Sequence, residues 1–231
     1  IHTLIVDNYK VSISVNLLNK CSSNKVNIIL CGLGHMPQTI VYPISGNNQT
    51  PAILKKQFLW KERIKGLIHQ KIVIEKIKNQ AKVLERHKRN KDVINKLYQF
   101  SQEVLIHDSG NREGLSAKMY FRELFGSDFI RFSEDSINAG LNYGYAILRT
   151  QISKALISRG LNVSIGIFHH GPENMFNLSD DIIEIIRPLV DNYVAVNLNY
   201  ETLFSREHRI NLVKLTTKKM IFKEEKHTFS S

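Results

Sequence analysis

Carboxylate and imidazole side chains gather in two stretches of the sequence that could together do chemistry. In one stretch, an apolar run typical of a strand, Ile165–Phe168, ends at His169 and His170, close in sequence to an acidic helix. That helix carries a polar stripe at steps of four, three and four residues: Asp180, Glu184, Arg187 and Asp191. In the other stretch, Glu113 lies in the first turn of an expected helix. Taken singly, each feature also has an ordinary explanation: a structural histidine, a surface ion pair, or an acid favoured by the helix dipole.

Helices are expected to position both stretches. Apolar residues at three- and four-residue steps predict a helix over Ser109–Phe125, closed by Gly126, and another over Ser136–Arg159, closed by Gly160. An earlier apolar stripe, from Trp60 to Leu84 and interrupted at Lys71, predicts a long helix with basic residues on its other faces.

The acidic helix of residues 179–194 has its own start and stop signals. Ser179 is expected to be its N-cap, with Asp180 and Asp181 in the first turn, where acids favour the helix dipole. Pro188 is expected to kink or interrupt the helix, because proline lacks the backbone N–H that continues it.

The fold class expected from these patterns is α+β, with a small N-terminal β-rich domain followed by a larger all-α domain. Residues 1–45 form the first, from strand-like runs at His2–Val6, Val26–Cys31 and Thr39–Tyr42 and a short helix within Val11–Leu18. Turn-forming residues at 46–50 predict a linker. Residues 51–231 form the helical domain, with a further strand expected at Met220–Phe222.

Positive charge is concentrated in one part of the chain. The 231 residues carry a formal net charge of +11, and residues 55–96 hold 14 Lys or Arg against four acids. A solvated helix face is the ordinary explanation of a charge run. An imbalance this large repels itself, however, and favours a polyanionic partner, with nucleic acid as the leading candidate. An anionic membrane surface is less suitable, because the basic helix lacks a Trp/Phe/Leu-rich interfacial face.

The two cysteines and the hydropathy indicate the compartment. Cys21 and Cys31 lie in expected apolar elements without a paired metal-ligand spacing, and we interpret them as buried free thiols in a reducing cytoplasm. No run approaches the roughly 18 consecutive apolar residues of a membrane span, so no membrane partner is expected.

Four ordered segments resemble one known family. The run Ser109–Gly126 closely resembles the REGxxAKxYFxxLFG segment of the larger, metal-dependent subunit of the CRISPR spacer-acquisition integrase. Ile137–Tyr145 resembles the family's next helix, and Ile165–His169 and Asn177–Pro188 resemble its histidine and final acidic segments. Ordered matches of this kind are far more specific than one motif, and the type II systems are the most similar.

The resemblance implies roles for particular residues. Carried over position by position, it makes Glu113, His169 and Glu184 the catalytic ligands of Mg²⁺ or Mn²⁺, with Asp181 and Asn142 as accessory residues. Basic residues suited to holding DNA phosphates are Arg112, Lys118, Lys76, Lys78 and Arg187.

Two departures from the family pattern stand out. Ile185 follows the final glutamate where many relatives have proline. The family also has further N-terminal strands, which form much of its dimer contact and are expected to precede Ile1.

The function implied is insertion of new spacer DNA into a CRISPR array, by attack of a 3′-hydroxyl on a repeat phosphodiester. With water as the attacking group, the same site acts as an endonuclease. The implied partners are double-stranded DNA (prespacer and repeat), a second copy of the chain, and a small ferredoxin-like CRISPR adaptation subunit.

Two other functions remain open at this point. A non-catalytic, basic DNA-binding scaffold subunit would use the charge of residues 55–96 without a working metal site. An HNH-like nuclease built on His169, His170 and Asn174 ranks last, because the expected ββα-metal context is absent from the sequence.

Overall fold

The N-terminal part of the chain is a small three-stranded sheet with one helix. The computed structural model describes residues 3–41, 49–215, 220–222 and 225–227. Strand β1 (Thr3–Val6) pairs in parallel with β2 (Asn27–Cys31), which pairs antiparallel with β3 (Pro37–Val41). Helix α1 (Val15–Ser23) forms the crossover between β1 and β2. Three strands were therefore predicted correctly to within two residues, and the central strand β2 is the most buried of them.

Helix α1 begins later than expected. Ser14, not a residue near Val11, is its N-cap and accepts a hydrogen bond from the backbone N–H of Leu17 at 3.3 Å. A serine side chain satisfies an N–H that the first turn leaves without a partner, which fixes the start. Of the expected linker at 46–50, residues 46–48 lie outside the described residues, and Thr50 is already the first residue of a helix.

Helices make up most of the chain that follows. In order they are α2 (Thr50–Phe58), α3 (Glu62–Arg86), α4 (Lys91–Gln102), the 3-10 turn η1 (Ile106–Asp108), α5 (Arg112–Phe125), α6 (Ser136–Ser158), α7 (Asn177–Ile183), α8 (Arg187–Asn197) and α9 (Arg206–Leu215). A short antiparallel pair, β4 (Met220–Phe222) and β5 (Glu225–His227), follows α9. The expected helices over 109–125 and 136–159 and the expected strand at 220–222 are confirmed, as is the α+β fold class.

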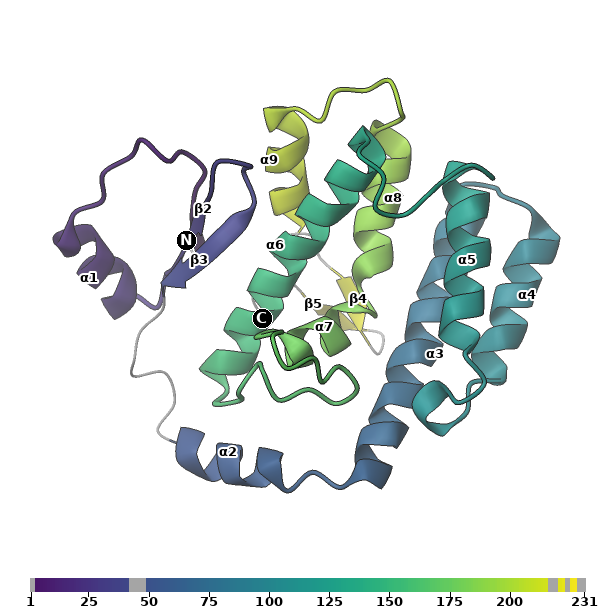
Figure 1. Cartoon of the computed structure of the whole chain (residues 1–231), viewed down its shortest axis with the longest axis horizontal. Helices are drawn as coiled ribbons and strands as arrows, with labels where there is room; N and C mark the ends of the chain where they lie inside the picture. The colour runs from purple at the N-terminus through teal and green to yellow at the C-terminus, as the bar shows by residue number, and fades with distance from the viewer. Residues whose placement is uncertain (1–2, 42–48, 216–219, 223–224, 228–231) are drawn as a thin grey trace.

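Two hydrophobic cores hold the helices in two groups (Figure 1). One core lies among α3, α4 and α5 and includes Ile77, Leu97 and Tyr120. The other lies among α6, α8 and α9 and includes Leu141 and Val194. Figure 1 shows the N-terminal sheet beside the second group and α2 running beneath it toward the start of α3.

Two expectations about residues 165–191 are wrong. Ser179 is not an N-cap: α7 begins at Asn177, and the Ser179 hydroxyl is buried 2.8 Å from that of Ser153 on α6. Ile165–Phe168 is a loop, not a strand, because the backbone N–H groups of Ile167 and Phe168 bond to the Asp181 side chain instead of a neighbouring strand. The acids of the polar stripe, for which a surface ion pair was the ordinary explanation, face the interior and are 1–6% exposed. The interruption at Pro188 is confirmed, because α8 starts there as a separate helix with the proline in its first turn.

Helix α3 follows its predicted apolar stripe only in its second half. Ile77, Ala81 and Leu84 are fully buried, but Ile64 is 48% exposed. Toward the middle of the helix, two polar side chains are buried as well: His69 is 4% exposed and Lys76 is 9% exposed. The helix therefore presents polar groups to the interior where it meets residues from α5 and from the loop before α7.

A buried carboxylate connects the two groups of helices. Asp191 on α8 is 1% exposed and accepts hydrogen bonds from the hydroxyls of Tyr120 on α5, at 3.0 Å, and Tyr145 on α6. Burial raises the pKa of Asp191 from its ordinary value of 3.8 to about 6, although both tyrosine hydrogen bonds lower it.

The cysteines differ from each other in their exposure. Both cysteines are free thiols, but only Cys31 is buried and Cys21 is partly exposed. Among the helices in the described part of the chain, none combines the length and apolar content needed to cross a lipid bilayer.

The raised pKa of Asp191 predicts a specific pH dependence of stability. Because the folded protein then binds more protons than the unfolded chain between about pH 4 and pH 6, its free energy of unfolding falls as the pH rises through that window. Asp191→Asn cannot titrate, so the stability of the native chain relative to this variant should fall by about 2–3 kcal/mol from pH 4 to pH 7. Denaturant unfolding at both pH values measures the difference, and a constant difference would contradict the prediction.

Candidate active site

Glu113 is positioned by the first turn of α5. The carboxylate of Asp108 accepts hydrogen bonds from the backbone N–H groups of Arg112 and Glu113, both at 2.9 Å, and so satisfies two N–H groups at the helix start. The preceding residue Asn111 adopts a left-handed conformation with φ of 48°. This sharp bend directs the Glu113 side chain toward α3, where its Oε1 atom lies 2.5 Å from Lys76 Nζ.

Glu184 lies at the junction of α7 and α8 and comes from the opposite side. It is 6% exposed, and its two oxygens contact two cations: Oε1 is 2.9 Å from Arg187 Nη1, and Oε2 is 2.5 Å from Lys76 Nζ. The contact with Lys76 is an ion pair without hydrogen-bond alignment. Burial raises the pKa of Glu184, but Lys76 and Arg187 outweigh it, so the pKa lies below its ordinary value. Glu184 is therefore a carboxylate at neutral pH.

Lys76 is the cation that the two glutamates share. Its side chain is 11% exposed and projects from α3. Burial would lower the pKa of Lys76, but the carboxylates of Glu184 and Glu113 outweigh it and raise the pKa above its ordinary value. The lysine thus stays charged between two carboxylates that come from different helices.

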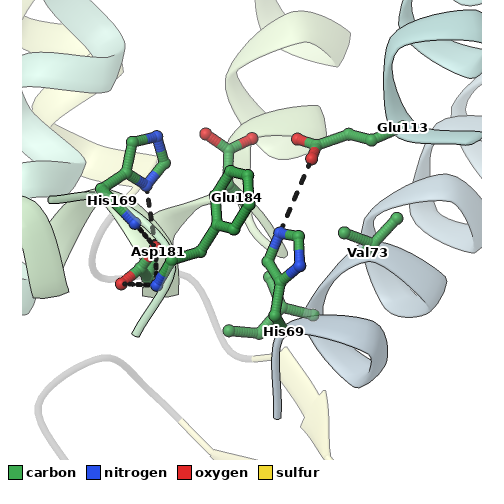
Figure 2. Close-up of a pocket in the computed structure, with 8 residues that line it drawn as sticks. His69, Val73, Glu113, His169, Asp181 and Glu184 are labelled. Atoms are coloured by element: carbon green, nitrogen blue, oxygen red, sulfur yellow. Dashed lines mark hydrogen bonds and ion pairs between the residues drawn. The ribbon is translucent and has the colours of Figure 1, made fainter. Parts of the chain in front are cut away.

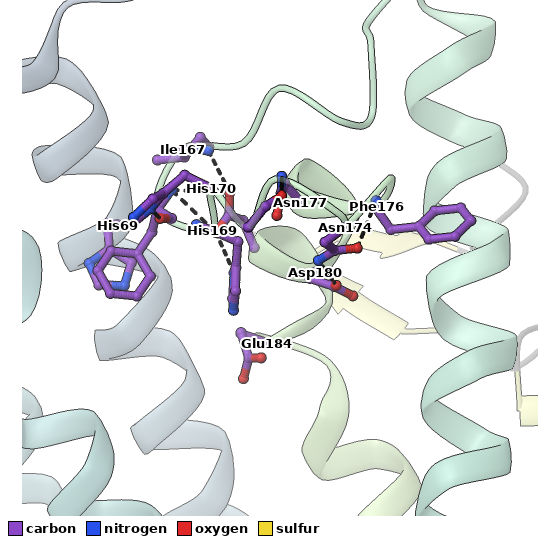
Figure 3. Close-up of polar contacts among 12 residues, drawn as sticks. His69, Ile167, His169, His170, Asn174, Phe176, Asn177, Asp180 and Glu184 are labelled. Atoms are coloured by element: carbon purple, nitrogen blue, oxygen red, sulfur yellow. Dashed lines mark hydrogen bonds and ion pairs between the residues drawn. The ribbon is translucent and has the colours of Figure 1, made fainter.

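Asp181 orients His169. Its carboxylate, 1% exposed, accepts hydrogen bonds from the backbone N–H groups of Ile167 at 2.5 Å, Phe168 at 3.2 Å and His169 at 3.0 Å. It also lies 2.8 Å from His169 Nδ1, and this hydrogen bond raises the pKa of the imidazole. With Nδ1 donating to Asp181, Nε2 is the nitrogen left for another partner. Figure 3 shows the ring directed toward Glu184.

These side chains line one pocket. Figure 2 shows the carboxylates of Glu113 and Glu184 pointing toward one another across it. The lining residues are His69, Ile72, Val73, Glu113, Phe168, His169, Asp181 and Glu184. The structure therefore brings together Glu113, His169, Glu184 and Asp181, which the sequence places in two distant stretches.

His69 belongs to the pocket and was missed in the sequence. Its ring stacks on that of Phe168 with centroids 3.9 Å apart, and its Nε2 lies 3.9 Å from Glu113 Oε2. Burial lowers the pKa of His69. The only signal was its spacing of seven residues, two helical turns, before Lys76 on α3, which placed both on one face.

The remaining predicted residues lie outside the pocket lining. Asn142 is exposed on α6 and accepts a hydrogen bond from Arg131 at 2.7 Å. Arg112 pairs with Glu103 at 2.9 Å, Lys78 pairs with Glu75 at 3.0 Å, and Lys118 is exposed on α5. Of the basic set, Lys76 and Arg187 contact the glutamates directly.

The donor chemistry fits a hard divalent cation. Two carboxylates already converge on one positive charge, and an oriented imidazole lies beside them. Carboxylate oxygens are ligands that suit Mg²⁺ or Mn²⁺. Within the described residues, no three His, Cys, Asp or Glu side chains are arranged to hold an ion as they stand. The ammonium group of Lys76 takes the position between the two glutamates.

Comparisons with known proteins point to one family. The family model described as "CRISPR associated protein Cas1" matches residues 1–224. A CRISPR-associated endonuclease Cas1 of Neisseria meningitidis serogroup C is 35% identical over 191 residues. That match covers 83% of this chain and 62% of the relative, so the chain spans less than two thirds of the relative's length.

Solved structures share the fold. A casposase bound to integration product superposes with a TM-score of 0.75 and 20% identity, over 100% of this chain and 74% of that one. A Cas6-RT-Cas1–Cas2 complex matches with a TM-score of 0.72 and 20% identity, over 98% of this chain and 29% of that one.

The hydrogen bond between Asp181 and His169 predicts a titration change. Asp181→Asn should lower the pKa of His169, because the carboxylate that stabilises the imidazolium is lost. NMR titration of the His169 ring measures this pKa. Asp180→Asn is the matched control, since Asp180 is also buried but bonds to Arg149 and Asn174 instead. An equal shift in both variants would contradict the assigned role of Asp181.

Proposed function

The chain belongs to the CRISPR-associated Cas1 family, and on that premise we propose that it is a metal-dependent DNA integrase and endonuclease. It inserts new spacer DNA into a CRISPR array by attack of a 3′-hydroxyl on a repeat phosphodiester. The observation that carries the proposal is the convergence of Glu113 and Glu184 on one cation beside the oriented His169. The name of the Neisseria relative, an endonuclease, supports it.

We propose that Glu113, Glu184 and His169 hold Mg²⁺ or Mn²⁺. When bound, the ion supplies Lewis-acid stabilisation of the charge that develops on the scissile phosphate. Lys76 and Arg187 keep Glu184 ionised, Lys76 also pairs with Glu113, and Asp181 keeps Nε2 of His169 available. Arg187 is itself held with its guanidinium 4.9 Å from the ring centre of Tyr145.

The bond changes need no external energy source. The 3′-oxygen of the incoming strand forms a bond to phosphorus while the repeat strand's own 3′-oxygen leaves and takes up a proton. One phosphodiester is broken and one is made, so no nucleotide triphosphate is required. When water attacks instead, the strand is cut, which gives endonuclease activity from the same side chains.

The proposed partners are DNA, a second copy of the chain and a small ferredoxin-like adaptation subunit. The basic residues of α2 to α4 suit the phosphates of a duplex. One structural relative is a Cas6-RT-Cas1–Cas2 complex, and the presence of Cas2 in it supports an adaptation partner of that kind. We propose the cytoplasm as the location, in keeping with two free thiols.

Removal of any proposed ligand should abolish strand joining. In an assay with Mn²⁺, a duplex with free 3′ ends and repeat-containing DNA, Glu113→Gln, His169→Ala and Glu184→Gln should each lower the joining rate at least about 100-fold, because each stabilises transition-state charge only through the ion. Glu75→Gln, a glutamate on the partly exposed side of α3, is the control. Unchanged joining in all three variants would refute the proposal.

The alternative of a non-catalytic scaffold makes a different prediction for the same protein. It binds DNA but neither cuts nor joins it in Mn²⁺ or Mg²⁺.

For both functions, Lys118→Ala and Lys78→Ala should weaken duplex binding and each reduce the slope of log K against log salt by about one. Filter binding between low and high salt measures the slopes, with Lys10→Ala, outside the helical part, as control. Joining activity then decides between the two.

A further inference from the structure

Lys76 occupies an unusual place for a lysine. Its ammonium nitrogen lies 2.5 Å from an oxygen of Glu113 and 2.5 Å from an oxygen of Glu184, and its side chain is only 11% exposed. Burying a lysine is costly unless it is paired, and Lys76 is paired with two carboxylates. The two glutamates arrive from α5 and from the α7–α8 junction, and without a cation between them they would repel each other.

The remaining oxygens of the two glutamates face other groups. Oε1 of Glu184 contacts Arg187 at 2.9 Å, and Oε2 of Glu113 faces the ring of His69 at 3.9 Å. The position between the carboxylates is therefore filled by Lys76. An ion such as Mg²⁺ bound by both glutamates needs their oxygens at about 2.0–2.1 Å, which leaves no room for an ammonium group in contact with the same two atoms.

We propose that Lys76 is a built-in counter-cation, which holds Glu113 and Glu184 together before the divalent ion binds and which the ion must displace. This inference rests on the proposed function, since the ion is the one that the two glutamates bind. The free energy of ion binding is then the difference between two interaction energies. One is that of the carboxylates with the ion, and the other is that of the same carboxylates with Lys76.

A purely structural lysine would behave differently. If Lys76 merely fixed the backbone of α3 against α5, its removal would misalign the glutamates and weaken ion binding. If it competes with the ion, its removal strengthens ion binding while destabilising the ion-free protein. The two effects on affinity have opposite signs.

The test uses the whole chain and Mn²⁺ alone as the probe. Lys76→Met keeps the length and the apolar stem of the side chain but removes the charge. Isothermal titration calorimetry should show Mn²⁺ binding at least about tenfold tighter than in the native chain. The melting temperature should fall in EDTA and rise more on Mn²⁺ addition than in the native chain. Equal or weaker Mn²⁺ binding overturns the proposal.

Two further variants serve as controls for charge and position. Lys76→Arg keeps a positive charge and should bind Mn²⁺ with an affinity closer to that of the native chain. Lys78→Met, two residues along α3, removes a lysine that pairs with Glu75 in a half-exposed position and should leave affinity and melting temperature nearly unchanged. Tighter binding of similar size in the Lys78 variant would also overturn the proposal.

An ion-free measurement separates this inference from the proposed function. In EDTA, Lys76→Met should lower the melting temperature much less in a Glu113→Gln, Glu184→Gln background, because the buried repulsion is already gone. Equal losses in both backgrounds overturn the counter-cation role. If the Glu113→Gln, Glu184→Gln variant binds Mn²⁺ as tightly as the native chain does, the proposed metal site is refuted instead. If Lys76→Met is unfolded in EDTA, Mn²⁺ should restore folding, and failure to do so overturns the inference.

Discussion

Negative charge brought together inside a protein is the constraint on which this structure depends. The partly buried Glu113 and the buried Glu184 meet, and Lys76 and Arg187 compensate their charge. Unpaired carboxylates in such a setting would take up protons and lose their capacity to bind a cation. Helix α3 therefore presents a charged side chain to the interior at a position where its neighbours Ile72, Val73 and Ile77 are apolar core. The same helix therefore provides both the charge that compensates the glutamates and the apolar residues that pack the core.

The site lies where two groups of helices meet, and this location makes it depend on both. Glu113 belongs to the group around α3 and α5, whereas Glu184 precedes α8 in the other group. The buried hydrogen bonds of Asp191 with Tyr120 and Tyr145 join the same two groups. A polar link buried at this junction specifies how the groups pack, because its hydrogen bonds are satisfied in one arrangement only. The spacing of the glutamates is set in part by residues that never touch the pocket.

Two acids one helical turn apart have different roles. Asp181 bonds to backbone N–H groups of the loop before α7 and to the imidazole of His169. Glu184 faces the cation. The loop at residues 165–168 is not a strand because the N–H groups of Ile167 and Phe168 bond to the Asp181 carboxylate, which shapes the chain around the histidine. Asp181, an accessory residue in the sequence-based prediction, thus holds the loop that lines the site.

The sequence by itself determined the three N-terminal strands, helices α3, α5 and α6 and the residues of the two chemical stretches, because these follow from local periodicity, turn residues and ordered segments. It gave no separate helices for α2, α4 and α9. It failed at Ser179 and Ile165–Phe168, where a distant side chain replaced the local partner. It marked Lys76 as a basic residue like Lys78, two positions away. Only the tertiary structure placed one between carboxylates and the other at the surface, and it alone brought His69 into the pocket. The physical reason is that burial and charge pairing are properties of surfaces that meet in space, which no single helix pattern contains.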